Sequence, residues 1–222
     1  MNKLNHIAFI MDCNGRWGKK KNKGRNFGHT NGIKTIKKIV EYSLQTKIPI
    51  LTFFVFSTEN WKRPKSEVNF LFKLIGSYFK KELKKILSSG IKLNIIGELN
   101  KLPSKTKFYL NKAIKLTKNN KKITVNLAVN YGSKNEIVSA IKKNKKTVNI
   151  RNIEENLYTK KLANPDILVR TGGHKRLSNF LLWQIAYTEI YFLDKLWPDF
   201  NNRDLNKIIK NYKKIKRNFG SI

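Results

Sequence analysis

The chain has 222 residues, with 47 Lys and Arg against 14 Asp and Glu, so its formal net charge at pH 7 is +33. Hydrophobic residues make up 40% of the chain, which is enough to build a core and excludes wholesale disorder. A single cysteine, Cys13, excludes an intramolecular disulfide framework and a cysteine-based zinc cluster.

Apolar stretches in the chain all fall short of the ~18 residues that a membrane-spanning helix needs. The first residues run directly into a strand-like segment and lack the pattern of a signal peptide. We therefore expect a cytoplasmic protein.

Positive charge is carried mainly by lysine, since only eight of the 47 basic residues are arginine. Abundant Lys, Asn and Ile are typical of an A+T-rich genome, so we interpret most of the charge as a solvated surface. Contact with nucleic acid or an anionic membrane is the alternative. Where Lys is accepted so widely, the remaining Arg indicate positions that need a planar, bidentate donor. Five of them lie in polar, loop-like segments and predict a site for phosphorylated ligands: Arg16, Arg25, Arg63, Arg170 and Arg176.

Apolar runs of strand length alternate with helical periodicity along the chain. We predict a strand at 6–11 followed by a loop over 12–29. Further strands are expected at 49–56, 91–97, 123–132, 166–170 and 189–194. Helices are expected at 30–45, 67–89, 104–118, 134–147 and 153–162, with a short buried element at 180–187 and a basic helix from Arg203.

This alternation predicts an α/β fold, with one domain over residues 1–222 and a mostly parallel six-stranded central sheet flanked by helices. Ligands bind such sheets beyond the carboxyl ends of the strands. Asp12, the segment 57–67 and Arg170 follow the first, second and fifth strands, so we expect them to meet at one edge. Acidic candidates near these segments are Asp12, Glu59 and Glu189.

Two glycine-containing loops could hold phosphate. DCNGRW at 12–17 follows a strand, so its backbone N–H groups could bind a diphosphate, and Asp12 could bind Mg²⁺ together with phosphate oxygens. RTGGHKRLSN at 170–179 places two arginines around two glycines. Neither loop has the P-loop or the dinucleotide-binding pattern. An ordinary turn with surface charges remains the alternative for each.

Taken together, several segments resemble the signature regions of the cis-prenyltransferases, most closely the bacterial undecaprenyl diphosphate synthases, or isoprenyl transferases. The segments are HIAFIMDCNGRW, GRNFGH, FSTENWKRP, NLAVNYG, DILVRTGGHKRLSNFLLWQIAYTEIYF and LWPDF. They keep their order and spacing from His6 to about Phe219, which is essentially the whole chain.

The resemblance implies an enzyme that adds isopentenyl diphosphate units to farnesyl diphosphate, each with a new cis double bond. The implied product is undecaprenyl diphosphate, the lipid carrier for cell-wall polysaccharide synthesis, which is delivered to the membrane. Mg²⁺ is the implied cofactor, and a homodimer with a hydrophobic tunnel is the implied assembly. We expect no nucleic-acid partner. We expect the enzyme to be cytoplasmic and located at the inner face of the membrane.

Residue roles follow from the same resemblance. Asp12 matches the catalytic, Mg²⁺-binding aspartate, and Glu189 matches a second Mg²⁺ ligand reached across the dimer. Asn60 matches the catalytic position regarded as the proton acceptor. A carboxamide is a poor base, so we interpret Asn60 as an orienting hydrogen-bond partner.

The other matched residues are those of the substrate sites. The allylic diphosphate site comprises Cys13, Asn14, Gly15, Arg16, Trp17, Arg25 and His29. The following loop supplies Ser57, Thr58, Glu59, Trp61 and Arg63. The isopentenyl diphosphate site comprises Arg170, Arg176, Leu177 and Ser178.

Departures from the family pattern are Cys13 and Ser133, where the family has Gly, and His174, where it has Glu. Glycine at position 13 in relatives predicts either a positive φ or a close approach of the backbone to diphosphate. We also expect the neighbouring Arg16 to favour the Cys13 thiolate. Val55 lies on the tunnel strand where many members have Ala, and its bulk could shorten the product.

Two alternative functions are a non-catalytic partner subunit of the same fold and a basic RNA-binding module. The first predicts a degraded Asp12 motif or a lost RTGG segment, and both are present. The second predicts stacking aromatics among basic residues on a β-surface, whereas the tryptophans here accompany the phosphate motifs.

Overall fold

The computed structural model describes residues 2–144 and 147–217. Its centre is a six-stranded sheet in the order β3-β4-β2-β1-β5-β6, and each of its strand pairs is parallel. The α/β fold is therefore confirmed, and the sheet is parallel throughout. The strands are β1 (His6–Ile10), β2 (Ile50–Ser57), β3 (Ile91–Ile96), β4 (Ile123–Tyr131), β5 (Ile167–Arg170) and β6 (Glu189–Phe192).

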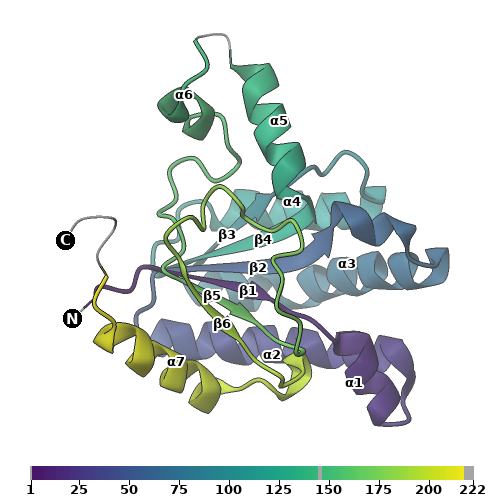
Figure 1. Cartoon of the computed structure of the whole chain (residues 1–222). Coiled ribbons are helices and arrows are strands. Elements are labelled where there is room, and N and C mark those ends of the chain that lie inside the picture. The colour runs from purple at the N-terminus through teal and green to yellow at the C-terminus, as the bar shows by residue number, and fades with distance from the viewer. Residues whose placement is uncertain (1, 145–146, 218–222) are drawn as a thin grey trace.

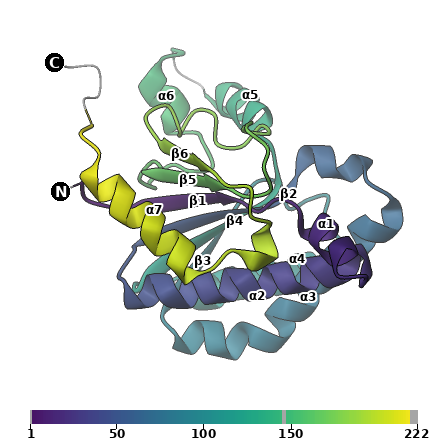
Figure 2. The same ribbon diagram turned by 60° about the horizontal axis from the view of Figure 1, so that its bottom comes forward.

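Helices cover both faces of this sheet (Figures 1 and 2). They are α1 (Asn14–Lys20), α2 (Gly24–Gln45), α3 (Lys65–Ser88), α4 (Ser104–Thr117), α5 (Ser133–Lys143), α6 (Ile150–Glu154) and α7 (Asn202–Lys214), with short 3₁₀ segments η1 (Thr58–Lys62) and η2 (Trp197–Asp199). No helix among the described residues is long and apolar enough to cross a bilayer.

The two faces of the sheet bury different side chains of the same strands. Ile7 and Phe9 of β1 face the larger core, which α2, α3, α4 and α7 close. Ala8 and Ile10 face the smaller core, which is closed by Phe180 and its neighbours. Successive residues of a strand point to opposite faces, so a strand buried on both sides is apolar throughout. This is why residues 6–10 form a continuous apolar run.

Residues 12–29, predicted to be a loop, instead form α1 and the first turns of α2. The glycines that suggested a loop are packing residues, since a Cβ at Gly18 would collide with Gly24 O and one at Gly28 with Asn14 O. Close approach of two helix backbones requires glycine at these contacts. Most of this segment is therefore helical, with a turn at residues 21–23 between the two helices.

The predicted bounds of two helices need correction. In place of the helix predicted at 153–162, the chain forms the shorter and earlier helix α6 at Ile150–Glu154. The side chain of Asn149 caps α6 by accepting a hydrogen bond from Asn152 N. Helix α6 does not continue because Tyr158 N donates to Glu136 Oε1 at 2.8 Å instead of to a helical carbonyl. The short element predicted at 180–187 is formed by bends and turns, and Phe180, Leu181, Gln184 and Ile185 are its buried residues. The helix predicted at 134–147 ends at Lys143, and residues 145–146 lie outside the described part of the chain.

Stability should depend on pH through His6, the first residue of β1. Burial of the imidazole lowers its pKa from 6.5 to about 4, although the hydrogen bond from Nδ1 to Ala163 O at 2.7 Å and the charge of Asp166 act to raise it. Because Nδ1 donates to a carbonyl, Nε2 of the neutral ring accepts from Thr52 Oγ1 at 2.7 Å. A lowered pKa stabilises the fold above pH 6.5, and this contribution is lost as the pH falls from 6.5 towards 4.

We expect the loss to reach about 3 kcal/mol of unfolding free energy. Urea unfolding at pH 7.5 and pH 4.5, compared between the natural chain and His6→Asn, measures it. The variant should have a lower free energy of unfolding at pH 7.5 than the natural chain. Its free energy of unfolding should fall less between pH 7.5 and pH 4.5. An equal acid loss in both chains would contradict the assignment.

Candidate active site

A cleft opens beyond the carboxyl ends of β1, β2 and β5. Asp12 follows β1, Ser57 ends β2 and Arg170 ends β5, so the prediction that these segments meet at one edge is confirmed. All five arginines singled out in the sequence line this cleft. The sequence-predicted residues that line it are Asp12, Cys13, Asn14, Gly15, Arg16, Arg25, His29, Ser57, Asn60, Arg63, Arg170, Arg176 and Ser178.

Asp12 and Arg170 form the ion pair at the centre of the cleft. Asp12 Oδ2 accepts from Arg170 Nη2 at 2.8 Å, and Oδ1 accepts from Cys13 N at 2.7 Å. Arg170 is buried and also donates from Nη1 to Arg176 O and to Ser178 Oγ. Burial acts to raise the pKa of Asp12, but the hydrogen bonds from Arg170 and Cys13 outweigh it and lower that pKa below its usual value. Asp12 is therefore ionised at neutral pH.

The donor set of the cleft fits Mg²⁺ shared with a substrate. Asp12 is the only carboxylate among the described residues that line the cleft, and a third of its side chain is exposed there. Mg²⁺ is typically held by one or two carboxylates together with phosphate oxygens. The residues present can thus supply one protein ligand, with the remaining oxygens coming from a diphosphate and water.

Glu67, in the first turn of α3, is a site residue that the sequence analysis missed. Its carboxylate accepts from Arg25 Nε and Nη2, both at 2.9 Å, from Arg63 Nη1 at 3.1 Å and contacts His29 Nε2 at 3.3 Å. Burial acts to raise the pKa of Glu67, and the hydrogen bond and charge of Arg25 lower it more. The i,i+4 spacing of Arg63 and Glu67 was the only signal for this cluster in the sequence.

The family resemblance implies an allylic diphosphate substrate, and we expect Glu67→Gln to raise the KM for it about tenfold, the equivalent of about 1.4 kcal/mol. The amide lacks the charge that holds the guanidinium groups of Arg25 and Arg63 beside each other, and the two groups then repel one another. Steady-state kinetics with the allylic substrate varied measures this. Glu155→Gln breaks the exposed pair with Arg151 and should change nothing. Equal KM values in both variants would contradict the positioning role of Glu67.

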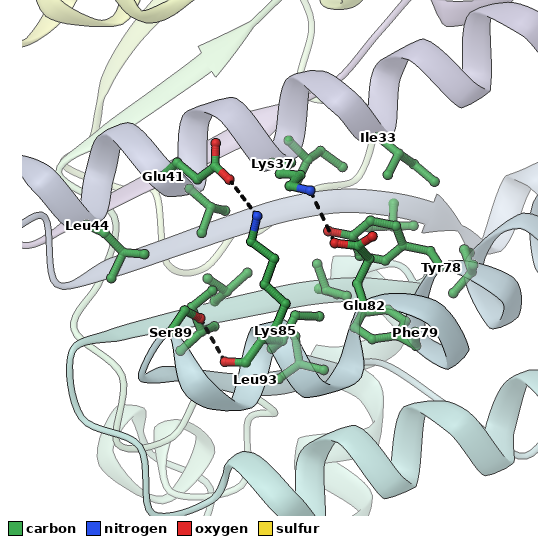
Figure 3. A pocket seen from close by; sticks show the side chains of 18 residues that line it. Ile33, Lys37, Glu41, Leu44, Tyr78, Phe79, Glu82, Lys85, Ser89 and Leu93 are labelled. Carbon is green, nitrogen blue, oxygen red and sulfur yellow. Dashed lines mark hydrogen bonds and ion pairs between the residues drawn. The ribbon is translucent and has the colours of Figure 1, made fainter.

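An apolar cavity lies between α2, α3 and the sheet (Figure 3). Its cavity volume is about 160 Å³, and it is partly open to solvent. Two ion pairs join α2 to α3 across it, Lys37 to Glu82 at 3.1 Å and Glu41 to Lys85 at 3.8 Å. Val55 of β2 lines both this cavity and the cationic cleft, so the two spaces adjoin at that side chain.

A β-bulge explains how Val55 reaches both spaces. Along β2, Phe54 pairs with Ala128 and Phe56 with Val129, so the register shifts around Val55. Bulges redirect a side chain and are common beside active sites.

Comparison with known proteins identifies the family of the chain. The profile of a family described as putative undecaprenyl diphosphate synthase matches residues 10–220. The chain is 46% identical over 221 residues to an isoprenyl transferase of Fusobacterium nucleatum, covering 98% of this chain and 96% of the relative. The chain belongs to the undecaprenyl diphosphate synthase family. It is therefore a prenyltransferase.

Solved structures of this kind of enzyme have the same fold. A probable undecaprenyl diphosphate synthase from Campylobacter jejuni superposes with a TM-score of 0.85 at 36% identity over 100% of both chains. Lavandulyl diphosphate synthase from Lavandula x intermedia, in complex with dimethylallyl diphosphate, superposes with a TM-score of 0.93 at 32% identity over 98% of both chains.

Some residues that the family resemblance assigns to substrate binding do not line the cleft of this chain. They are Trp17, Thr58, Glu59, Trp61 and Leu177. Trp17 stacks on Phe27 at 5.6 Å, and Trp61 donates from Nε1 to Asn130 Oδ1. Glu59 Oε1 accepts from Asn179 Nδ2. These contacts brace the walls of the cleft, so a role in binding stays a prediction.

Glu189, predicted to be a metal ligand, lies at the far end of its strand from the cleft. It pairs in register with Ile167, whereas Phe192 pairs with Arg170 at the cleft edge. One chain therefore does not bring Glu189 to Asp12. Its metal role stays a prediction that requires a second copy of the chain.

Cys13 has the backbone conformation that glycine in the family suggests. Its φ is 74°, in the left-handed region, at the residue that precedes α1. The expected thiolate is wrong, however. Burial and the adjacent Asp12 raise the pKa of the thiol, and the hydrogen bond from Arg16 does not compensate. The thiol is protonated at neutral pH.

Proposed function

We propose that this prenyltransferase joins isopentenyl diphosphate units to farnesyl diphosphate with cis geometry and releases a polyprenyl diphosphate of about undecaprenyl length. The observation that carries this proposal is the junction at Val55 between a cationic cleft and an apolar cavity. A prenyl diphosphate has a charged diphosphate end and a hydrophobic hydrocarbon end. The cationic cleft matches the first, and the adjoining apolar cavity matches the second.

The allylic diphosphate is proposed to bind where α1 and α2 face the cleft. Arg16, Arg25, Arg63 and His29 surround this region, and Arg donates two parallel hydrogen bonds to phosphate. Negative charge grows on the diphosphate oxygens as the carbon–oxygen bond breaks. These donors are already in place, so they stabilise that charge with little reorganisation.

Isopentenyl diphosphate is proposed to bind at the loop after β5. Arg176 and Ser178 line the cleft there, and Arg170 ties both of them to Asp12. The two diphosphates then lie on either side of Asp12. Mg²⁺, held by Asp12 and substrate oxygens, would neutralise the charge of the leaving diphosphate.

Asn60 is proposed to orient a substrate group without taking its proton. Its Oδ1 accepts from Ser57 N at 3.1 Å and closes a capping box at η1, which leaves the amide NH₂ as the free donor. An amide donor cannot serve as a base. A diphosphate oxygen is the candidate acceptor of the proton that the new carbon–carbon bond releases.

A homodimer is proposed to form along the edge strand β6. Exposed apolar side chains gather there, with Tyr187 at 64% and Ile190 and Phe192 each at 37% exposure. An uncovered apolar strand edge is a typical pairing surface. Such a dimer gives Glu189 access to a partner's cleft. We also propose that the enzyme is cytoplasmic and delivers its product to the inner face of the membrane.

Incubation with farnesyl diphosphate, radiolabelled isopentenyl diphosphate and Mg²⁺ tests the proposal. Butanol-extractable label should appear, and chromatography after dephosphorylation should show alcohols much longer than the primer. Carbon-13 NMR of the product should show cis bonds in the added units. Products of a single condensation would support a short-chain synthase instead, and no incorporation would contradict the proposed reaction.

A further inference from the structure

Three potential metal ligands of different chemistry meet at the entrance to α1. A carboxylate oxygen of Asp12, Sγ of Cys13 and a ring nitrogen of His174 all lie within 4.8 Å of one another. Each of the three residues lines the cleft, so an ion can reach the group from solvent. Mg²⁺ prefers oxygen ligands, so the binding of Mg²⁺ does not require the sulfur of Cys13 or the ring nitrogen of His174.

A cationic group already sits among these atoms. Arg16 Nη2 donates to Cys13 Sγ, to Gly172 O at 2.8 Å and to His174 Nε2 at 3.1 Å. Donation to Nε2 requires that the imidazole lone pair is on that atom and points toward the shared space. The sulfur and the imidazole nitrogen thus already accept hydrogen bonds from one cation, and a carboxylate oxygen of Asp12 lies within 4.8 Å of both.

We propose that Cys13, His174 and Asp12 form an inhibitory site for Zn²⁺ or a similar borderline metal ion. Thiolate and imidazole ligands favour such ions over Mg²⁺. In a tetrahedral zinc site with bonds of about 2.0–2.3 Å, neighbouring ligand atoms lie about 3.5 Å apart, so small side-chain rotations close the group around the ion. The fourth position remains open for water or a diphosphate oxygen.

Binding of Zn²⁺ has two consequences for the cleft. The Cys13 S–H bond breaks, a sulfur–zinc bond forms and the proton passes to the buffer. Arg16 must leave its present position, and Asp12 is taken from Mg²⁺. The ion site itself does not depend on the proposed reaction, but the inhibition rests on it.

Cobalt(II) binding tests the site without any activity measurement. A cobalt–thiolate bond gives a near-ultraviolet charge-transfer band, and Cys13 is the only thiol of the chain. Titration of the metal-free chain with Co²⁺ should produce this band at one ion per chain, and Zn²⁺ should displace it. Mg²⁺ alone should produce no band. The absence of a band with the folded natural chain would overturn the proposal.

Two variants identify the ligands. Cys13→Ser should lose the band, and His174→Gln should keep it with an affinity for Co²⁺ and Zn²⁺ at least tenfold lower. Loss of a ligand or its support typically weakens metal binding 10–100-fold. Circular dichroism and thermal melting confirm that each variant is folded. Unchanged Zn²⁺ affinity in His174→Gln would overturn the three-residue site.

Inhibition is measured separately on prenyl transfer at fixed Mg²⁺. Zn²⁺ should inhibit the natural chain, and His174→Gln should need at least ten times more Zn²⁺ for half-inhibition of its own rate. The same inhibiting concentration in both chains would overturn the inhibitory role. Cobalt binding in a chain that shows no prenyl transfer would refute the proposed reaction and leave the ion site standing.

Discussion

Asp12→Asn should lower kcat by about a thousandfold, the size of effect expected when a central electrostatic group of an active site is lost. The carboxylate is the one acidic group among the described cleft residues, and it is ionised because Arg170 and Cys13 N donate to it. The amide keeps the shape of the side chain but loses the charge that would hold Mg²⁺ in the proposed mechanism. Steady-state kinetics at saturating Mg²⁺ measures the loss.

Stability should also change, because buried Arg170 loses its charged partner. We expect a fall in unfolding free energy of about 1–3 kcal/mol, which leaves the chain folded. Asp204→Asn is the matched control, since it removes a carboxylate paired with Lys195 and placed on α7. That control should keep kcat within twofold. Turnover of Asp12→Asn within tenfold of the natural chain would contradict the assignment of Asp12.

Arg170→Lys should lower kcat/KM for isopentenyl diphosphate about a hundredfold although the charge is kept. Arg170 donates to Asp12, Arg176 O and Ser178 Oγ at once, and it is only 2% exposed. A lysine ammonium cannot span these acceptors, and loss of two charge-assisted hydrogen bonds at about 1.5 kcal/mol each gives this magnitude.

Arg203→Lys is the control for Arg170→Lys because Arg203 is exposed in the first turn of α7. Its kinetics should match those of the natural chain. Equal losses in the two variants would contradict the argument that scarce arginines mark functional positions. A loss confined to Arg170→Lys would support it.

Strands and the cleft edge could be predicted because they depend on local patterns. Continuous apolar runs such as 6–10 indicate strands buried on both faces, and parallel strands carry their following loops to one edge. This placed Asp12 and Arg170 together although they are far apart in the chain. The scarcity of arginine then selected the residues that line the cleft.

The parts that could not be predicted depend on packing between elements. Helix α1 exists because glycines let its backbone approach α2, and in the sequence these glycines are indistinguishable from loop glycines. Glu67 joins the site only because α3 packs beside α2 and brings it to Arg25. The protonated state of Cys13 follows from burial, which the sequence does not reveal.

In the proposed reaction, the cleft and the cavity form one active site that meets at Val55. Val55→Trp tests it directly, since a larger side chain at the junction should block the cavity and leave the diphosphate ligands in place. With farnesyl diphosphate and labelled isopentenyl diphosphate, we expect the natural chain to make long polyprenyl products and Val55→Trp to stop after one to three additions, with a KM for farnesyl diphosphate within tenfold of normal. Products of unchanged length from a folded Val55→Trp variant would contradict the account.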